Sequence, residues 1–214
     1  MLYRRPIVNE PIRQGDIFRA VPKIDFNPSN ATLVDESGYS RTSWPLSATE
    51  TDDEEDLTFL VVVRPVTAIV VTQDCDALRQ EFLTLCEIND FRIVERKAEK
   101  TKDAKGWVSL ITRQARVNLK WFYLPPDPSV GFSIKMAVDF RSTLSVQRGT
   151  LEDMVQEFRV ASLTRIAREH FRERLSEFLR RYPYDEWYSL NREEFQAYQR
   201  QLRDVVQPFP WQRP

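Results

Sequence analysis

The sequence predicts an α+β protein whose sheet is curled or closed into a small barrel. Two observations support this class. Short runs of apolar and β-branched residues come first, over residues 15–21, 57–63, 67–72, 82–88, 121–124, 136–146 and 158–163. Two helical patterns follow, over 163–182 and from 191 onward. A series of strands followed by helices is typical of α+β architectures. At 214 residues and 42% hydrophobic content, the chain is long enough to bury a sizeable core.

The N-terminal strands are predicted from two different apolar patterns. "GDIFRAV" at 15–21 alternates, which places Ile17 and Val21 on one face and Phe18 on the other. "LTFLVVV" and "TAIVVT" are continuous apolar runs, which predicts buried strands. The Arg64-Pro65 step lies between them, and proline cannot donate to a strand ladder. We therefore expect two separate strands with a break at Arg64-Pro65.

The helical patterns lie in the C-terminal quarter of the chain. Apolar residues repeat at i, i+3 and i+4 through five turns of 163–182, and Pro183 ends the pattern. His170 lies on this apolar stripe, so we expect it to be packed in a core or an interface. A second helix is predicted to begin at Asn191, where "NREE" matches a capping box.

The formal net charge of −1 conceals two segments of opposite sign. Residues 27–58 carry eight acidic side chains against one basic side chain, Arg41, and residues 92–120 carry nine basic against three acidic. The acidic segment resembles a long loop, which we expect to be mobile at least in part. Residues 89–105 could form a helix with a thin apolar stripe. The charge asymmetry could attract RNA at one end, or both segments could be solvated loops.

The motif "TQDCD" ends the apolar run at 67–72. If the chain stays extended there, Asp74 and Asp76 share one face, and with Gln73 they form a polar strand end. Two carboxylates can hold a divalent cation through oxygen ligands. They can also cap a turn or pair with arginines. No further acidic ligands are evident, so we favour a turn or an arginine pair and predict no metal site.

The cysteine and histidine content limits the chemistry of the chain. Cys75 could act as a nucleophile only with a base, and the single imidazole is His170. Cys86 alternates with core positions of its strand. One histidine and two cysteines do not make a zinc site, and no glycine-rich phosphate loop is present, so we predict no cofactor. This cysteine usage fits a reducing cytoplasm, and no apolar run approaches the ~20 residues that span a bilayer.

Basic and aromatic residues alternate through the segment 107–123. Arg113 and Arg116 lie close in sequence to Trp121, and single-stranded RNA binding uses cations for phosphates and rings for bases. In a strand only alternate residues face outward, so at least half of "KWFY" at 120–123 should be core. We therefore take Arg113, Arg116 and Trp121 as candidate binding residues, with core packing as the alternative for the rings.

The N-terminal third resembles the MazF/PemK family of toxin-like ribonucleases over residues 13–88. The resemblance depends on the Gly15–Phe18 strand, "DFNP" at 25–28, and Arg64-Pro65 leading to Val70-Val71-Thr72. It implies an SH3-like β-barrel that is generally dimeric and cleaves single-stranded RNA without a metal. Arg64 aligns with the family's catalytic arginine, and Thr84 or Thr112 would supply the hydroxyl. The expected domains are a barrel at 1–163, with the acidic insertion at 27–58, and a helical segment at 164–214 packed on it.

A second resemblance is to a group of bacterial proteins that no single activity defines. It joins "QGDI" at 14–17, "QDCD" at 73–76, and an "R-x-A-x-L…REH" pattern at 159–170.

For the barrel we expect the Gly15 and Ile69 segments to lie together, with Arg64 and Asp74 at one rim.

The expected function is that of a MazF/PemK-like binding or regulatory module in a bacterial toxin–antitoxin or defence system. Some similar proteins serve as binding modules, such as the sigma-factor-sequestering partner in CRISPR-associated protease signalling. An acidic insertion fits that use, and the expected partner is an antitoxin, a sigma factor or a protease. A homodimer is a further possibility. The alternative is an active, metal-independent endoribonuclease built on Arg64. A third class is a metal-dependent nuclease built on Asp74 and Asp76.

Overall fold

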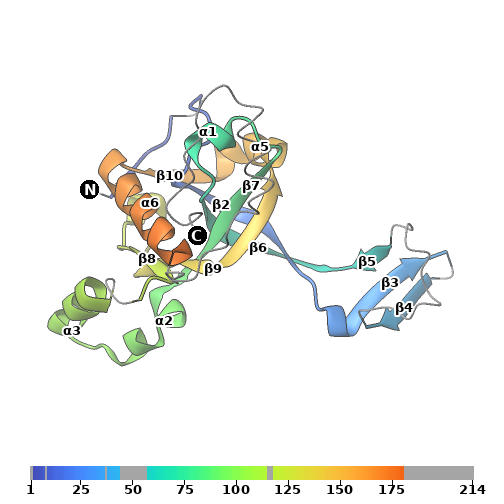
Figure 1. Cartoon of the computed structure of the whole chain (residues 1–214), viewed down its shortest axis with the longest axis horizontal. Helices are drawn as coiled ribbons and strands as arrows, with labels where there is room; N and C mark the ends of the chain where they lie inside the picture. Colours follow the sequence, from blue (N-terminus) through green and yellow to red (C-terminus); the bar gives the residue numbers. More distant parts are fainter. Residues whose placement is uncertain (1, 8, 37, 44–56, 115–117, 181–214) are drawn as a thin grey trace, which may run out of the picture. The chain divides into compact units, whose positions relative to one another are not determined.

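The computed structural model describes residues 2–7, 9–36, 38–43, 57–114 and 118–180. They form two antiparallel sheets with helices between and after the strands, as Figure 1 shows, so the α+β class is confirmed. The chain divides into two compact units, Met1–Phe178 and Leu179–Pro214, and the first contains both sheets. The helix predicted from Asn191 lies outside the described residues.

The larger sheet has seven strands. Their order is β1 (Tyr3–Arg4), β10 (Arg159–Leu163), β2 (Asp16–Asp25), β6 (Val62–Val70), β7 (Phe82–Asp90), β9 (Met136–Gln147) and β8 (Trp121–Leu124), and every neighbouring pair is antiparallel. The strands predicted at 82–88, 121–124, 136–146 and 158–163 are therefore present within a few residues.

This sheet is not closed, so the prediction of an SH3-like barrel is wrong. Over the described residues no ladder joins the edge strands β1 and β8. The sheet nevertheless curves enough for the Tyr3 hydroxyl of β1 to donate to the carbonyl of Pro125, just after β8, at 2.8 Å. Closure needs paired strands with matching stagger, and a two-residue β1 offers too little ladder for it.

Both faces of the central part of the larger sheet are buried. Ile17, Ile69 and Cys86 are register partners on β2, β6 and β7, and they belong to the core that α6 (Arg165–Leu179) covers with Phe171. The other face is covered by Leu151 of α5 (Arg148–Phe158) and by α1 (Asp74–Ala77). Burial on both sides explains the unbroken apolar run of residues 68–70 at the end of β6. The core position predicted for Cys86 and the helix predicted at 163–182 are confirmed, the latter over the bounds of α6.

A β-bulge in β2 changes the predicted alternation. Phe18 pairs with Ala68 and Val21 pairs with Val66, so β2 has one residue more than β6 between these pairs. Ala20 takes a left-handed φ of 54° in the bulge. The extra residue moves Val21 to the face of Phe18, so the prediction that Val21 shares a face with Ile17 is wrong.

Residues 91–114 form four short helical elements and a third apolar core. They are α2 (Phe91–Val94), η2 (Arg96–Lys100), α3 (Ala104–Ser109) and η3 (Leu110–Gln114). The single helix considered for 89–105 is therefore wrong. The side chains of Asp90, Glu95 and Asp103 each accept a hydrogen bond from a following backbone N–H, so a new cap begins each of the first three elements.

The segment predicted to be a long loop contains a second sheet. It consists of β4 (Gly38–Thr42), β3 (Ala31–Asp35) and β5 (Thr58–Leu60), after a short η1 (Pro28–Asn30) that Asn27 caps. The prediction of a loop is therefore wrong for residues 28–35 and 38–42. Residues 37 and 44–56 lie outside the described residues, and the expected mobility stays a prediction.

Arg64-Pro65 lies inside β6 and does not separate two strands. The interruption falls at Val61, between β5 and β6. Pro65 is the register partner of Pro22, so this step of the β2–β6 ladder lacks two N–H donors. The predicted proximity of the Gly15 and Ile69 segments is confirmed, since the Gly15 N–H donates to the Val70 carbonyl at 2.9 Å. Arg64 and Asp74 lie toward opposite ends of β6, so they do not share a rim.

Candidate functional site

Beyond the paired prolines, β2 and β6 continue as a two-stranded ribbon over residues 23–25 and 62–64. Ile24 and Val63 are register partners and point to one face, because side chains alternate along a strand. Their exposed fractions are 62% and 54%. Lys23 and Arg64 are also register partners and point to the opposite face. The ribbon is therefore amphipathic, and its apolar face, which we call the ribbon face, is open to solvent.

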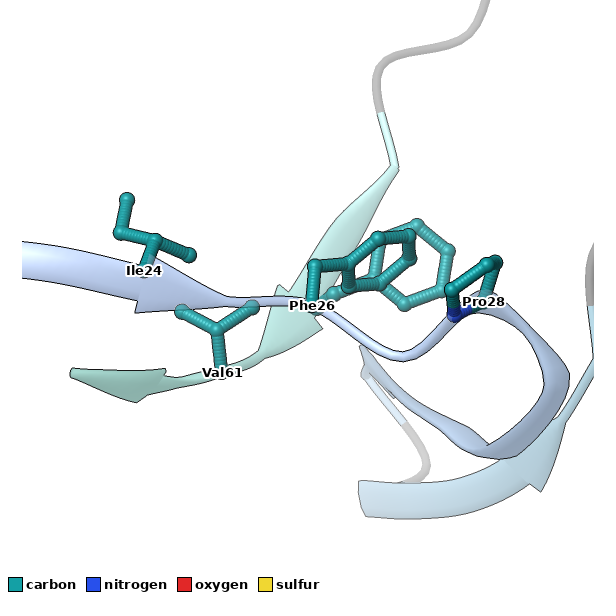
Figure 2. A pocket seen from close by; sticks show the side chains of 5 residues that line it. Ile24, Phe26, Pro28 and Val61 are labelled. Carbon is teal, nitrogen blue, oxygen red and sulfur yellow. The ribbon is translucent and has the colours of Figure 1, made fainter. Parts of the chain in front are cut away.

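The ribbon face is hollowed where β2 leads into the small sheet. A pocket of about 360 Å³ is lined by Ile24, Phe26, Pro28, Phe59 and Val61, as Figure 2 shows. The Phe26 and Phe59 rings meet edge to face with centroids 5.4 Å apart. Every lining side chain is apolar, and Phe26 is 45% exposed. An exposed apolar hollow of this kind is typical of interaction surfaces.

Three exposed hydrophobic side chains belong to this face, namely Ile24, Phe26 and Val63. Val62 is also exposed, but it is the register partner of Asp25 and therefore points to the opposite face. The sequence analysis missed this surface because it took 57–63 as a buried strand. The alternation of Ile24 and Phe26 with Lys23 and Asp25 was the signal that could have indicated one apolar face.

The opposite face of the ribbon carries a polar cluster centred on Glu87, which is only 4% exposed. One Glu87 oxygen, Oε2, accepts from Lys23 Nζ at 2.7 Å and from Ser142 Oγ at 2.8 Å. The other, Oε1, accepts from Arg64 Nη1 at 3.1 Å. Arg64 Nε also donates to Asp25 Oδ2 at 3.3 Å. Four adjacent strands, β2, β6, β7 and β9, supply this cluster.

The contacts of the cluster favour the charged forms of Glu87 and Arg64. Burial by itself would raise the pKa of Glu87, but the hydrogen bonds from Lys23, Ser142 and Arg64 outweigh it and lower that pKa. The hydrogen bonds that Arg64 donates, first to Glu87 and then to Asp25, raise the pKa of its guanidinium. Arg64, predicted to be catalytic, is thus held by two carboxylates while its side chain remains 48% exposed.

The predicted catalytic hydroxyl does not lie beside Arg64. Thr84 is on β7 next to Val71, whose N–H donates to the Thr84 carbonyl. Val71 lies seven positions after Arg64, which corresponds to about 23 Å of extended chain. Thr112 donates instead to the Val108 carbonyl in the helical region. The hydroxyl nearest Arg64 in this network is Ser142 of β9, which the sequence analysis missed because the alternation of a strand does not reveal its partner strand.

The "QDCD" motif begins a helix, so the predicted common face of Asp74 and Asp76 is wrong. Asp74 Oδ1 accepts from the Gln14 N–H at 2.9 Å, and Oδ2 accepts from Arg172 Nη2 at 2.6 Å. The interpretation of Asp74 as an arginine partner is therefore confirmed. Gln73 is exposed, and its carbonyl accepts from the first turn of α1. Within the described ranges, no three side chains of histidine, cysteine, aspartate or glutamate gather to hold a metal ion.

The three motifs of the second resemblance lie in two neighbouring networks. Gln14 receives a hydrogen bond from Arg172 Nε at 2.6 Å, beside Asp74. Asp16 accepts from Ser162 and from Arg159 Nη1, the latter at 3.2 Å, and its burial raises its pKa. Both oxygens of each aspartate are occupied by donors of the chain itself. These networks fasten the N-terminal segment and α6 to the sheet.

Cys75 and His170 do not form a catalytic pair in the described part of the chain, where no hydrogen bond joins them. Both are exposed, and His170 Nδ1 lies 3.9 Å from Glu173. His170 is not a core residue, since its side chain is 67% exposed, and its expected place in an interface stays a prediction. The buried positions of α6 are Ala167 and Phe171. The apolar stripe predicted from the sequence of 163–182 is therefore wider than the face of α6 that packs on the sheet.

The rings of the basic segment belong to the core. Trp121 is 1% exposed, and its indole N–H donates to Glu95 Oε2 at 3.3 Å. The alternative of core packing is therefore confirmed for Trp121, while Arg113 is exposed. Arg116 lies outside the described residues.

No family model, curated protein or solved structure matches this chain. The MazF/PemK resemblance therefore stays a prediction. None of the helices in the described ranges is long and apolar enough to cross a membrane.

Proposed function

We propose that the protein is a binding module that captures a protein partner on the ribbon face. The observation that carries this proposal is the exposed apolar hollow between Ile24 and Phe59. Its volume of about 360 Å³ suits one or two large apolar side chains. It has no polar lining group to orient a small polar molecule, which ligand sites normally provide.

The charge of the neighbouring sequence favours a basic partner. Six carboxylates occur in "ETDDEED" at 50–56, directly before β5, and Phe59 of β5 lines the hollow. Opposite charges around an apolar contact increase the rate and specificity of association. The proposed partner segment therefore has a large apolar residue flanked by lysine or arginine. The family resemblance suggests an antitoxin, sigma factor or protease in a bacterial toxin–antitoxin or defence setting.

Peptide binding tests the proposal directly. The probe is a fluorescent peptide with a Leu-Phe core flanked by lysines, and its control has glutamates in place of the lysines. We expect Ile24→Ser/Val63→Ser to weaken binding about tenfold or more, because two apolar side chains no longer pack on the peptide. Ile93→Ser/Val108→Ser removes equally exposed side chains elsewhere and should leave binding unchanged. Equal binding of both peptides, or equal weakening in both variants, would contradict the proposal.

These side-chain variants are preferable to removal of residues 30–56. That removal would delete β3 and β4 and so disrupt the small sheet beside the hollow.

A second candidate is a metal-independent endoribonuclease, favoured by the gathering of Arg64, Lys23, Ser142 and Glu87 on one face. These are a cation pair, a hydroxyl and a carboxylate, which can stabilise phosphate charge and move a proton. Cleavage of single-stranded RNA that survives EDTA and is abolished in Arg64→Ala would support this activity. Cleavage that stops with EDTA would indicate a metal-dependent nuclease. The absence of cleavage would leave the binding module as the function.

A further inference from the structure

Residues 91–114 form a strongly basic surface, which we call the basic lobe. Its exposed cations are Arg92, Arg96, Lys97, Lys100, Lys102, Lys105 and Arg113. None of these seven forms an ion pair within the described part of the chain. Only two exposed carboxylates, Glu99 and Asp103, belong to the same stretch, which leaves an excess of five positive charges.

The remaining carboxylate of the lobe does not neutralise this surface. Glu95 is buried, and it accepts hydrogen bonds from Asn118 Nδ2 at 2.6 Å, from the Trp121 indole and from the backbone N–H of Lys97. These bonds and the nearby Lys120 lower the pKa of Glu95 despite its burial. The negative charge of Glu95 is therefore balanced by donors inside the lobe and does not offset the cations on its surface.

The cations project from a packed scaffold. The apolar sides of the helical elements form a core of Phe91, Val94, Ala98 and Leu110 against Trp121. The Phe91 and Trp121 rings meet edge to face at 4.8 Å. Because the scaffold is folded, a ligand does not have to order the backbone that presents the charges, which lowers the entropic cost of binding.

We propose that the basic lobe binds the sugar–phosphate backbone of duplex nucleic acid without reading its sequence. Duplex DNA carries about one charge per 1.7 Å of axis, so neutralising its phosphates releases many counterions. Single-stranded binding depends on exposed rings for stacking. Phe91 and Trp121 are buried, and Lys135 Nζ already lies 4.3 Å from the centre of the Trp107 ring. The lobe therefore presents cations that can contact phosphates, and its rings are not available to stack on bases.

An anionic membrane surface fits the lobe less well. Membrane-surface helices bury a continuous apolar face. Here the helical elements have four to six residues and turn their apolar faces into the core, with only Ile93 and Val108 exposed. This second binding surface is independent of the ribbon face.

Fluorescence anisotropy of the full chain with a labelled DNA duplex about two helical turns long tests the proposal. The lobe variant is Lys100→Glu/Lys102→Glu/Lys105→Glu. The matched control is Arg5→Glu/Arg79→Glu/Arg165→Glu, which reverses three exposed cations elsewhere that also have no ion pair in the described ranges. Salt is varied from about 50 to about 200 mM.

We expect the wild-type protein and the control to bind the duplex, with affinity that falls as salt rises. The lobe variant should bind about tenfold more weakly or worse, and the slope of log affinity against log salt should shrink by about 0.9 for each phosphate that the variant no longer neutralises. Circular dichroism should show both variants folded.

Four results would overturn the proposal. They are no binding at the lowest salt, equal weakening in the lobe variant and the control, tighter binding of a single strand of equal length, and lobe-dependent binding to phosphatidylserine vesicles without duplex binding.

Discussion

Replacing Glu87 by glutamine tests whether the polar cluster on the ribbon stabilises the fold. Glutamine keeps the shape of the side chain but removes its charge, so Lys23 and Arg64 lose their shared ionic acceptor. Glu87 is 4% exposed, which means that water cannot readily replace the missing carboxylate.

The magnitude follows from the three hydrogen bonds that Glu87 accepts. The bond from Lys23 at 2.7 Å is charge-assisted and partly buried, and such bonds contribute about 1.5 to 3 kcal/mol. The bond from Ser142 adds about 1 kcal/mol, and the bond from half-exposed Arg64 adds little because water screens it. Glutamine can still accept one hydrogen bond through its amide oxygen, and burying its neutral amide costs less free energy than burying a carboxylate. We therefore expect a net decrease of about 2 kcal/mol in the free energy of unfolding.

Urea unfolding followed by tryptophan fluorescence measures this decrease, and Tm should fall by about 4 to 8 °C for a folded unit of this size. Arg64→Gln is the matched control, and it should cost less than Glu87→Gln because the Arg64 side chain is 48% exposed and water screens its ion pairs. The reasoning fails if Glu87→Gln is as stable as wild type, or if Arg64→Gln costs more than Glu87→Gln.

The pH dependence supplies an independent check. The pKa of Glu87 in the folded state lies below its ordinary value of 4.5, so the unfolded state takes up a proton first as pH falls. The stabilisation is thus complete above about pH 4.5 and disappears as pH falls through the folded pKa. Glutamine does not titrate, so the stability difference between wild type and Glu87→Gln should shrink below that pH.

Three further predictions concern backbone strain, the α6 network and the thiols. Ala20→Gly should raise the free energy of unfolding by about 0.5 to 1 kcal/mol, since Ala20 has a φ of 54°, and an unchanged or lower urea midpoint would contradict this. Asp74→Asn should lower the free energy of unfolding by about 1 to 2 kcal/mol, because it weakens the 2.6 Å hydrogen bond from Arg172. A double-mutant cycle of Asp74→Asn and Arg172→Gln measures the coupling between the two side chains, and strictly additive effects would argue against the contact. A thiol reagent should modify exposed Cys75 quickly in the native protein and Cys86 only after unfolding, because burial raises the pKa of Cys86 to about 12; fast modification of both thiols would refute this.

The sequence predicted most strands of the larger sheet and the presence of α6 because these depend on local periodicity. It did not predict that a helix begins at Asp74. The polar residues that follow a strand and those that begin a helix are of the same types, so composition does not distinguish the two. The sequence analysis also missed the small sheet at 31–42, whose Ser- and Thr-rich strands resemble a loop in composition. Two-residue periodicity identifies the faces of a strand and leaves its neighbours undetermined.

By itself the sequence determined that an α+β core forms and that acidic and basic charges are separated along the chain, because burial patterns and charges are properties of local residues. The tertiary structure alone shows that the sheet stays open, that Arg64 donates to Glu87 and lies far from Thr84, and that the described residues leave the ribbon face exposed. These outcomes depend on strand order and register, which the bulge at Ala20 and contacts between distant residues fix, and no short stretch of sequence contains that information.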